Sequence, residues 1–443
     1  MRSSCFVFLM AALLLLPAVA SAQLQVDVDS AEFRKYPIAI TSFKNIGEGE
    51  DKWGFAELSG NVMRNDLGLT GLFEVLDPKG FLEDPTKAGI DAGSIDFTNW
   101  LQVGADGLLK GGYTISDSEI TAEMHVFDVA LAREMLTKKY TVQRKDARAL
   151  IHRLANDVVE FFTLKRSIFN TKIVAVRQIN RVKQIYVMDF DGENGFVLVD
   201  NANLNLLPTW HPNGKEIYFT SYIANNPDLY RIGLSRGSKL MKVSSYRGLN
   251  VGADVSPDGS KIALTLSKDG NSEIYSISTG GSNGRRLTNA WGIDSSPSWA
   301  PDNTRLAFVS DRSGSPQIYM LDTASGATTR LTFQGTYNQS PNWSPDSEKI
   351  CFSGRDEMMG YDLFIVDATT REITRLTQDQ GRNEDCAWSP DGRHIVFSSD
   401  RTGEYKLWIM TADGKTQKQI SYQPGSFSTP DWSPMFQEVG DEK

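Results

Sequence analysis

Few residues of this chain stand in a pattern that could do covalent chemistry. The clearest is Gly280-Gly281-Ser282-Asn283-Gly284, which matches the G-x-S-x-G signature of a nucleophilic serine. That chemistry needs the serine on a sharp turn from a strand to a helix, whereas Ser282 lies in a Gly/Ser-rich segment between two expected strands. We therefore predict a hairpin turn at Ser282 and no catalytic residue.

Residues that could bind a metal are equally sparse. None of the histidines stands at metal-ligand spacing from another histidine or from a cysteine; they are His125, His152, His211 and His394. His211 and His394 border expected turns, which indicates solvated positions. Ser256-Pro257-Asp258-Gly259 resembles a sialidase Asp-box but lacks its spacer between Asp and Gly, so a type I turn explains it better. The sequence predicts neither a metal site nor a bound cofactor.

The overall composition is that of a folded, acidic protein. The 443 residues include 40% hydrophobic and 23% charged side chains, enough for two or three domains with buried cores. Lysine and arginine number 46 against 55 aspartates and glutamates, a formal net charge of −9 with no basic run. Because binding to a phosphate backbone needs clustered positive charge, this composition argues against a nucleic-acid partner.

The start of the chain has the pattern of an export signal. Arg2 precedes an apolar run at residues 6–16, and Ala20-Ser21-Ala22 forms an A-x-A cleavage site. The run is too short to span a bilayer, which needs about 20 apolar residues. We expect cleavage after Ala22, removal of residues 1–22 as a signal peptide, and an exported protein without direct membrane insertion.

A period of 44 to 45 residues organises the second part of the chain. Trp-Ser-Pro and related triplets place prolines at Pro212, Pro257, Pro301, Pro345, Pro390 and Pro434. A second mark, an aliphatic residue followed by an aromatic one, keeps the same period from Ile185-Tyr186 to Leu407-Trp408. Each unit is typical of four short strands with turns such as Ser-Pro-Asp-Gly between them. Four-stranded units at this period are the blades of a β-propeller.

The ends of the repeat region predict how a ring of blades closes. The last Trp-Ser-Pro, at residues 432–434, has no following strands, and the strand that begins at Lys172 has no Trp-Ser-Pro before it. We predict that residues 431–434 supply the innermost strand of the blade begun by Lys172, which removes two exposed strand edges. The propeller would then have six blades and a C-terminal strand that closes the first.

Two cysteines, Cys351 and Cys386, remain after removal of the signal. Export permits a disulfide bond, and the two residues lie in adjacent repeats. We favour two small, separately buried thiols and leave the disulfide bond open.

The region before the ring lacks the repeat and predicts a small α/β domain at residues 37–165. Expected strands are 37–43, 73–76, 119–128 and 135–142, and expected helices are 57–67, 98–103 and 146–163. The fold class is thus mixed, with this α/β domain followed by an all-β six-bladed β-propeller at residues 166–436. We expect residues 23–36 to be a flexible partner-binding segment and residues 437–443 an acidic tail.

The loops that lead from one blade into the next are expected to lie together at one face, the mouth of the propeller. Their amide, aromatic and aliphatic side chains, with few titratable groups, suit gripping a protein segment more than transforming a substrate. At any single position, solvation or blade packing is the alternative interpretation. The candidate contact residues are Leu249, Asn250, Gly252, Trp291, Asp294, Ser295, Tyr337, Asn338, Gln339, Arg382, Asn383 and Phe427.

Three stretches make the chain similar to the TolB family of periplasmic proteins. They are the junction Lys165-Arg166-Ser167-Ile168-Phe169-Asn170-Thr171-Lys172-Ile173, the segment Val255-Ser256-Pro257-Asp258-Gly259-Ser260-Lys261-Ile262-Ala263 and the ending Pro430-Asp431-Trp432-Ser433-Pro434. The resemblance covers the whole chain in its order of export signal, α/β domain and six blades.

This resemblance implies a non-enzymatic, monomeric adaptor of the periplasmic Tol-Pal system, which maintains outer-membrane integrity and constriction during cell division. Its mouth would bind Pal, the peptidoglycan-associated lipoprotein, and colicins would imitate Pal there. Other outer-membrane proteins are further implied partners. Leu249, Gly252 and Ser295 match family positions that face Pal, although the best-known members have a histidine in place of Leu249.

The resemblance also implies that the mature N-terminus binds the inner-membrane protein TolA. The residues concerned are Gln23, Leu24, Gln25, Val26, Asp27, Val28, Asp29 and Ser30. Their alternation of valine with aspartate would let an extended segment add to a sheet edge of the partner. Two alternatives stay open: a periplasmic propeller hydrolase or lyase acting on peptides or glycans, and a scaffold with unrelated partners.

Overall fold

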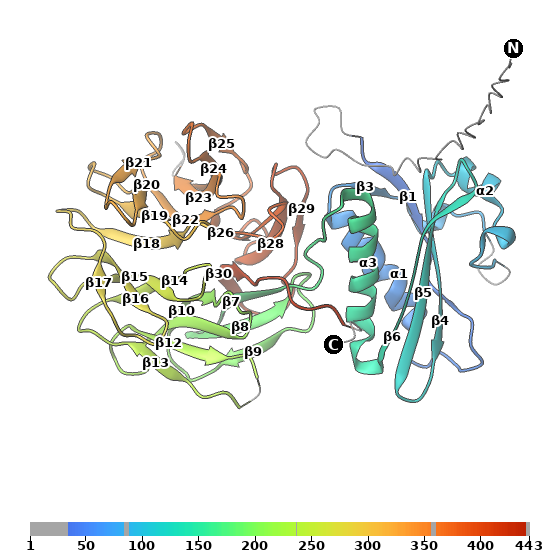
Figure 1. Ribbon diagram of the computed structural model, residues 1–443, viewed down its shortest axis with the longest axis horizontal. Coiled ribbons are helices and arrows are strands. Elements are labelled where there is room, and N and C mark those ends of the chain that lie inside the picture. The colour runs from blue at the N-terminus through green and yellow to red at the C-terminus, as the bar shows by residue number, and fades with distance from the viewer. Residues whose placement is uncertain (1–33, 84–87, 236, 356–359, 440–443) are drawn as a thin grey trace, which may run out of the picture.

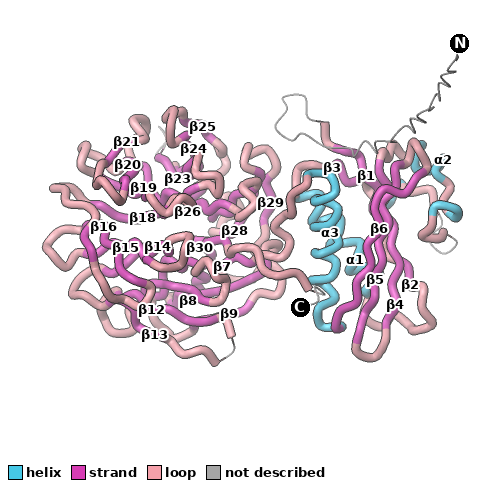
Figure 2. The backbone as a smooth tube through the Cα atoms, viewed as in Figure 1, coloured by secondary structure: helices cyan, strands magenta, loops and turns pink. Residues whose placement is uncertain are grey.

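Helices and strands are segregated along the chain. The computed structural model describes residues 34–83, 88–235, 237–355 and 360–439. Within these residues every α-helix lies before residue 164, and the rest consists of strands and loops (Figure 2). Figure 1 shows the two long helices of the N-terminal domain between its sheet and the propeller. The architecture is the predicted one, an α/β domain followed by an all-β propeller.

The N-terminal domain is built on a six-stranded sheet in the order β3-β1-β4-β5-β6, with β2 pairing to β4. β1 is parallel to β3 and β4, whereas β4, β5 and β6 form an antiparallel meander. The bounds are β1 (Tyr36–Ile40), β2 (Lys44–Asn45), β3 (Phe73–Val75), β4 (Gly107–Ile115), β5 (Glu119–Asp128) and β6 (Arg133–Gln143).

The sequence predicts β1, β3, β5 and β6 but not β4, because glycines weaken its strand pattern. One of them, Gly111, has a packing role: a Cβ there would lie 2.7 Å from the ring of Phe43. The glycine therefore lets that buried ring lie against the sheet.

Three α-helices complete this domain: α1 (Phe55–Leu69), α2 (Phe97–Gln102) and α3 (Ala147–Thr163), with single 3-10 turns at Pro78–Gly80, Ala92–Ser94 and Arg144–Asp146. Helix α3 is buried on most sides. Its apolar side chains, such as Leu150 and Leu154, join the main hydrophobic core, while Asn156 donates a hydrogen bond to Glu438 at 2.7 Å. This burial follows from the place of α3 between the sheet and the propeller (Figure 1).

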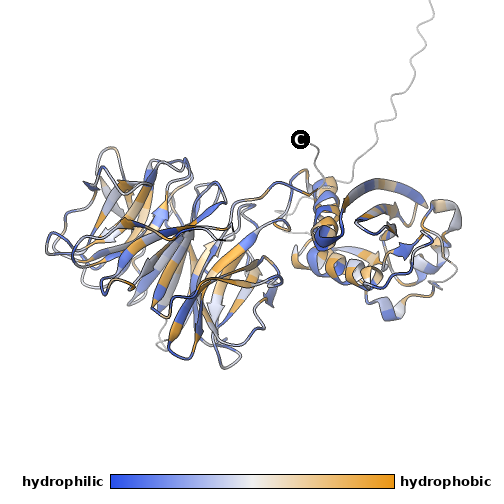
Figure 3. Ribbon diagram, turned by 90° about the horizontal axis from the view of Figure 1, so that it is seen from below, coloured by the Kyte–Doolittle hydropathy of each residue, from blue (hydrophilic) through white to orange (hydrophobic). Residues whose placement is uncertain are grey.

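Six four-stranded antiparallel sheets form the propeller, and apolar and polar residues are interspersed along their strands (Figure 3). The first blade is β30-β7-β8-β9 and the others follow in chain order, β10 to β13 through β26 to β29. The bounds are β7 (Lys172–Ile179), β8 (Val182–Asp189), β9 (Phe196–Val199), β10 (Asn205–Trp210), β11 (Glu216–Ser221), β12 (Asp228–Gly233), β13 (Met241–Ser244), β14 (Asn250–Val255), β15 (Lys261–Leu266), β16 (Glu273–Ser278), β17 (Arg285–Arg286), β18 (Asp294–Trp299), β19 (Arg305–Ser310), β20 (Gln317–Asp322), β21 (Thr328–Arg330), β22 (Asn338–Trp343), β23 (Lys349–Arg355), β24 (Tyr361–Asp367), β25 (Ile373–Arg375), β26 (Asn383–Trp388), β27 (His394–Ser399), β28 (Lys406–Thr411), β29 (Gln417–Gln419) and β30 (Ser426–Trp432).

A C-terminal strand closes the ring as predicted, although it runs over Ser426–Trp432 and not over residues 431–434. β30 pairs antiparallel with β7, and Trp432 lies opposite Ile173 in the register. The Trp432 indole N–H donates to the Thr171 hydroxyl at 2.8 Å, and the Lys172 backbone N–H donates to Ser433 Oγ at 2.8 Å. Because β30 pairs with β7, the edge of β7 that would otherwise be exposed is covered.

Each inner strand carries a bulge that joins neighbouring blades. The backbone is left-handed at the same point in all six strands, at Leu207, Gly252, Ser296, Ser340, Asp385 and Thr429. Just after the bulge, a side-chain oxygen accepts the backbone N–H of a tryptophan in an adjacent blade. Asp254 accepts from Trp299 at 2.6 Å, and Asp431 from Trp210 at 2.8 Å; Asn342 accepts from Trp388 at 2.9 Å.

Two of these acceptors are carboxylates deep in the propeller. Burial, together with the nearby charge of Asp431, raises the pKa of Asp254 to about 7. Burial likewise raises the pKa of Asp431 to about 6, although the N–H of Trp210 and the hydroxyl of Thr209 oppose the shift. The ionised forms of these two carboxylates are therefore costly. A neutral amide, such as that of Asn342 in another blade, makes the same hydrogen bond without a buried charge.

Two expectations about single residues are wrong. Cys351 and Cys386 form a disulfide bond, because their strands β23 and β26 lie in adjacent blades and bring the Cα atoms to 6.3 Å. His394 is fully buried and not solvated, since the N-terminal domain covers it and its Nε2 lies 3.2 Å from the Leu69 carbonyl oxygen.

None of the helices that the structure describes is long and apolar enough to cross a membrane.

Removal of the Trp432 side chain should open the closing blade. We expect Trp432→Ala to lower the free energy of unfolding by about 3–5 kcal/mol, the usual cost of deleting a buried aromatic ring. Denaturant unfolding followed by fluorescence measures this value. Trp291→Ala is the matched control, because Trp291 is 78% exposed, and it should change stability by less than about 0.5 kcal/mol. Equal effects of the two variants would contradict the closing role of β30.

Neutralising Asp254 should stabilise the propeller at alkaline pH. Because the pKa of Asp254 is raised to about 7, its ionised carboxylate destabilises the folded protein at pH 8. This destabilisation becomes smaller as the pH falls toward the ordinary pKa of an aspartate. We expect Asp254→Asn to gain on the order of 2 kcal/mol at pH 8 and clearly less at pH 5, as measured by denaturant unfolding.

Asp322→Asn is the control of opposite sign, since the Ser325 backbone N–H lowers the pKa of Asp322. This exposed carboxylate favours the folded state above its ordinary pKa, so its loss should destabilise the protein at pH 8. An Asp254→Asn variant that is less stable than the natural chain at both pH values would refute the argument.

Candidate functional site

The propeller mouth is the end at which the six inner strands begin. It comprises the loops at 203–207, 248–252, 290–296, 335–340, 381–385 and 425–429. The loops between second and third strands reach the same end: the Asp311 N–H donates to the Ile293 carbonyl oxygen at 3.4 Å, and the Asp400 N–H to the Arg382 carbonyl oxygen at 3.2 Å. Two sets of loops therefore build this face.

Large apolar side chains are concentrated on the loops of the mouth. On these loops Trp291 is 78% exposed and Ile293 52%. Phe333 and Tyr422, which are 59% and 69% exposed, lie on the segments that lead from the fourth strands β21 and β29 toward these loops. Leu204, Leu207, Ile223, Tyr246 and Leu249 are also exposed there. Solvent-exposed apolar side chains gathered on one face are typical of an interaction surface.

Sequence reasoning finds only part of this apolar set. It includes Trp291 and Leu249 but misses Ile223, Phe333 and Tyr422. Ile223 lies on the second set of loops, which the repeat analysis leaves out, and the other two stand just outside the loop bounds assigned from the repeat. The signal for Phe333 and Tyr422 is an aromatic residue three positions after the end of a fourth strand.

Five of the candidate contact residues are buried inside the blades. They are Asn250, Asp294, Asn338, Asn383 and Phe427, each no more than 2% exposed. Four of them are the first residues of inner strands, where the side chain turns inward. Asn338, for example, donates to Gln317 Oε1 at 3.0 Å, and Asp294 accepts from Arg312 at 2.7 Å. These residues therefore shape the mouth from below, and we leave them out of the proposed contact surface.

The other candidates lie at or near the surface. Trp291, Leu249 and Arg382 are exposed, whereas Gly252, Ser295, Tyr337 and Gln339 are half-buried. The left-handed backbone of Gly252, with φ of +61°, is the bulge position of its strand. The ring of Tyr337 meets that of Tyr361 edge-on at 6.3 Å.

The sixth blade places an acidic group beside these residues. Glu384 accepts hydrogen bonds from Tyr405 at 2.6 Å and from Gln339 at 3.3 Å. Burial, with the charge of Glu384, raises the pKa of the adjacent Asp385 to about 6. The mouth thus combines an apolar surface with carboxylates, a mixture that suits a partner presenting both apolar and hydrogen-bond-donating groups.

Ser282 lies in the predicted hairpin turn between β16 and β17. Its backbone N–H and its hydroxyl both contact Ser278 Oγ, at 3.0 and 2.9 Å. Likewise Ser256 heads a turn in which Gly259 N–H donates to the Ser256 carbonyl oxygen at 2.7 Å. Both motifs are explained by the turns they make.

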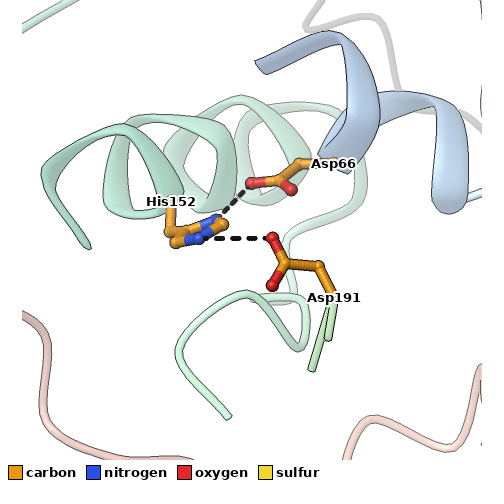
Figure 4. Close-up of side chains that lie close together, drawn as sticks. All are labelled: Asp66, His152 and Asp191. Carbon is orange, nitrogen blue, oxygen red and sulfur yellow. Dashed lines mark hydrogen bonds and ion pairs between the residues drawn. The ribbon is translucent and has the colours of Figure 1, made fainter. Parts of the chain in front are cut away.

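The N-terminal domain contacts the opposite face of the propeller. His152 on α3 and Asp66 on α1 meet Asp191, which lies in the turn between β8 and β9 (Figure 4). The sequence gives no sign of this cluster, since its members are far apart along the chain.

A cavity of about 370 Å³ lies in the N-terminal domain near the end of β1. The three basic side chains in its wall already have protein partners. Lys110 pairs with Glu83, and Lys44 and Arg64 donate to backbone carbonyl oxygens at 2.7 and 3.1 Å. The cavity therefore offers no separate argument for a ligand.

The expected signal peptide at 1–22 and the predicted TolA-binding residues, Gln23 to Ser30, lie outside the described residues.

Comparison with known proteins agrees with this architecture. The family model of the TolB beta propeller domain matches residues 159–360 and 356–439, and that of the TolB amino-terminal domain matches residues 24–135. A crystal structure of TolB from Acinetobacter baumannii superimposes with a TM-score of 0.80 at 26% identity, covering 93% of this chain and all of that one.

Curated relatives are similar over part of their length. The Tol-Pal system protein TolB of Anaeromyxobacter dehalogenans strain 2CP-C is 40% identical over 284 residues, and that of Desulfosudis oleivorans is 37% identical over 286 residues. In each case the match spans 64% of this chain and 64% of the relative. Because the propeller family model alone matches more than half of the residues, this chain belongs to the TolB family.

Proposed function

We propose that the protein is a non-enzymatic periplasmic adaptor of the Tol-Pal system, binding Pal at the propeller mouth and TolA through its mature N-terminus. The observation that carries the first part is the group of exposed apolar side chains at the mouth, headed by Trp291 and Ile293. Family membership supports both partners, because similar proteins are named as Tol-Pal components.

The mouth is suited to hold a protein segment. A large aromatic side chain that is exposed in the free protein becomes an anchor when a partner covers it, and such anchors carry much of the binding energy. Trp291 has this character, and Arg382 adds a charged, exposed hydrogen-bond donor near the same face. Carboxylates such as Glu384 would select for donors on the partner.

The two proposed binding sites belong to different parts of the chain. The proposed TolA segment precedes β1 in the N-terminal domain, which packs on the face of the propeller opposite the mouth. Occupation of the mouth by Pal would therefore have to act through the blades to affect TolA binding. Such coupling would link an energised inner-membrane complex to outer-membrane integrity and to constriction during division.

Changing the mouth should weaken Pal binding without unfolding the protein. We expect Trp291→Ala to raise the dissociation constant for Pal at least about 30-fold, since loss of a central aromatic anchor costs about 2 kcal/mol or more. Calorimetric titration with purified Pal measures this constant. Met241→Ala is the control, because Met241 is also exposed but lies on the outer strand β13. An equal loss in both variants, or none in Trp291→Ala, would contradict the assignment of the mouth.

Deleting residues 23–30 should separate the two partners. The deletion is expected to abolish capture of TolA while Pal is retained with unchanged affinity, because residues 172–432 supply all four strands of each of the six blades. Pull-down with each purified partner makes this comparison. Simultaneous loss of both partners would argue against two independent sites, and retention of TolA would move its site elsewhere.

A further inference from the structure

The N-terminal domain and the propeller share one continuous interior. A single hydrophobic cluster includes Leu154 and Phe162 of α3 together with Phe190 and Leu407 of the first and sixth blades. Within this apolar contact lies a group of buried charges, formed by Asp66, His152 and Asp191. Buried charges between two domains are costly unless they neutralise one another, so the charge state of this group affects how firmly the domains hold together.

His152 links the two domains. Its Nδ1 lies 2.6 Å from Asp66 Oδ2 on α1, and its Nε2 lies 3.8 Å from Asp191 Oδ2 on the propeller. The side chain of His152 is only 6% exposed, that of Asp66 0% and that of Asp191 4%. Figure 4 shows the imidazole between the two carboxylates, with one ring nitrogen directed toward each.

The turn that carries Asp191 is anchored to the blades that close the ring. The Gln423 side chain donates to the Gly192 carbonyl oxygen at 2.8 Å. A Cβ at Gly192 would lie 1.7 Å from the Ile420 carbonyl oxygen, so the turn rests directly on the sixth blade. A contact made to Asp191 is therefore a contact to both the first and the sixth blade.

Other charged groups face the imidazole from the surrounding elements. Arg148, one turn earlier on α3, donates to Asp191, and Lys418 on β29 donates to Asn65 beside Asp66. The ring of Phe190 meets the imidazole edge-on at 5.3 Å. The charge of Arg148 neutralises that of Asp191, so the charge of Asp66 is neutralised by the proton on His152. Lys418 contacts the group through the side-chain amide of Asn65.

An imidazole and two carboxylates also occur together in metal sites. Here each carboxylate already has a cationic or N–H partner, Asp66 in His152 and Asp191 in Arg148. These contacts are those of an ion-pair network. We therefore interpret the group as a protonated histidine between two carboxylates and not as a metal site.

We propose that protonated His152 is an acid-stabilised latch, which bridges Asp66 of the N-terminal domain and Asp191 of the propeller and loosens when the proton leaves. Without that proton, two buried carboxylates face one another across the contact, and Arg148 is the sole cation bonded directly to them among the described residues. The α3 surface would then separate from the first and sixth blades more readily, while each domain keeps its own core.

The direction of the pH dependence follows from the surroundings of the imidazole. Burial alone lowers the pKa of His152, but the charge and hydrogen bond of Asp66, helped by Asp191, outweigh it and raise the pKa above its ordinary value of 6.5. A group with a raised pKa contributes stability below its ordinary pKa and loses that contribution as the pH rises through the raised value. The latch should therefore hold at mildly acidic pH and weaken at alkaline pH.

Hydrogen exchange of the full-length mature protein tests the latch without any partner. We expect exchange of residues 147–163, corrected for the intrinsic effect of pH, to speed up several-fold between pH 6 and pH 8.5 as the proton leaves His152. Titration of ¹³C-labelled histidine by NMR should give His152 a midpoint above 6.5. Pal and TolA binding are not involved, so this result and that of the proposed function can fail separately.

Variants decide whether His152 is responsible. His152→Gln should remove the pH dependence of hydrogen exchange. Asp191→Asn should shift the midpoint of that pH dependence to lower pH, and this second variant keeps the test valid if His152→Gln folds poorly. His211→Gln is the matched control, because that half-buried histidine stacks on Tyr218 away from the contact and should leave the midpoint unchanged. The proposal is overturned if exchange of α3 in the natural protein does not depend on pH, or if Asp191→Asn leaves its midpoint where it was.

Discussion

The pairing of β30 with β7 is the constraint on which the rest of the molecule depends. It joins the two ends of the repeat region into one sheet and removes the edges that an open array would expose. The first and sixth blades meet at this closure, and the N-terminal domain rests on the same two blades through Asp191 and His394. Ring closure thus sets both the shape of the mouth and the seat of the N-terminal domain.

The two faces of the ring have different chemistry. The mouth carries exposed aromatic and aliphatic side chains, which suit a partner that binds and leaves, whereas on the opposite face the first and sixth blades make a continuous apolar contact with buried charges. Communication between them would have to pass through the inner strands, whose bulges already link each blade to its neighbour. Coupling of this kind requires an element with two arrangements, and the domain contact at His152 is such an element if its proton can be lost.

Periodicity made the propeller predictable, because every blade repeats the same alternation and the same turn residues. The closing strand was predictable from what was missing at each end of the repeat. The mouth was predicted only in part, since one residue separates an exposed loop position such as Leu249 from an inward-facing strand start such as Asn250. The cluster at His152 could not be read at all, because Asp66 is 86 residues away in the sequence and local pattern carries no information on such distant contacts.

The measurement that tests the central claim most directly is site-specific photo-crosslinking in the periplasm. A photoreactive side chain at position 291 places the probe in the mouth, and one at position 131 places it on the exposed surface of the N-terminal domain. We expect Pal to be captured from position 291 and not from position 131. Capture of Pal only from the N-terminal domain would contradict an account in which the ring grips a protein at its mouth.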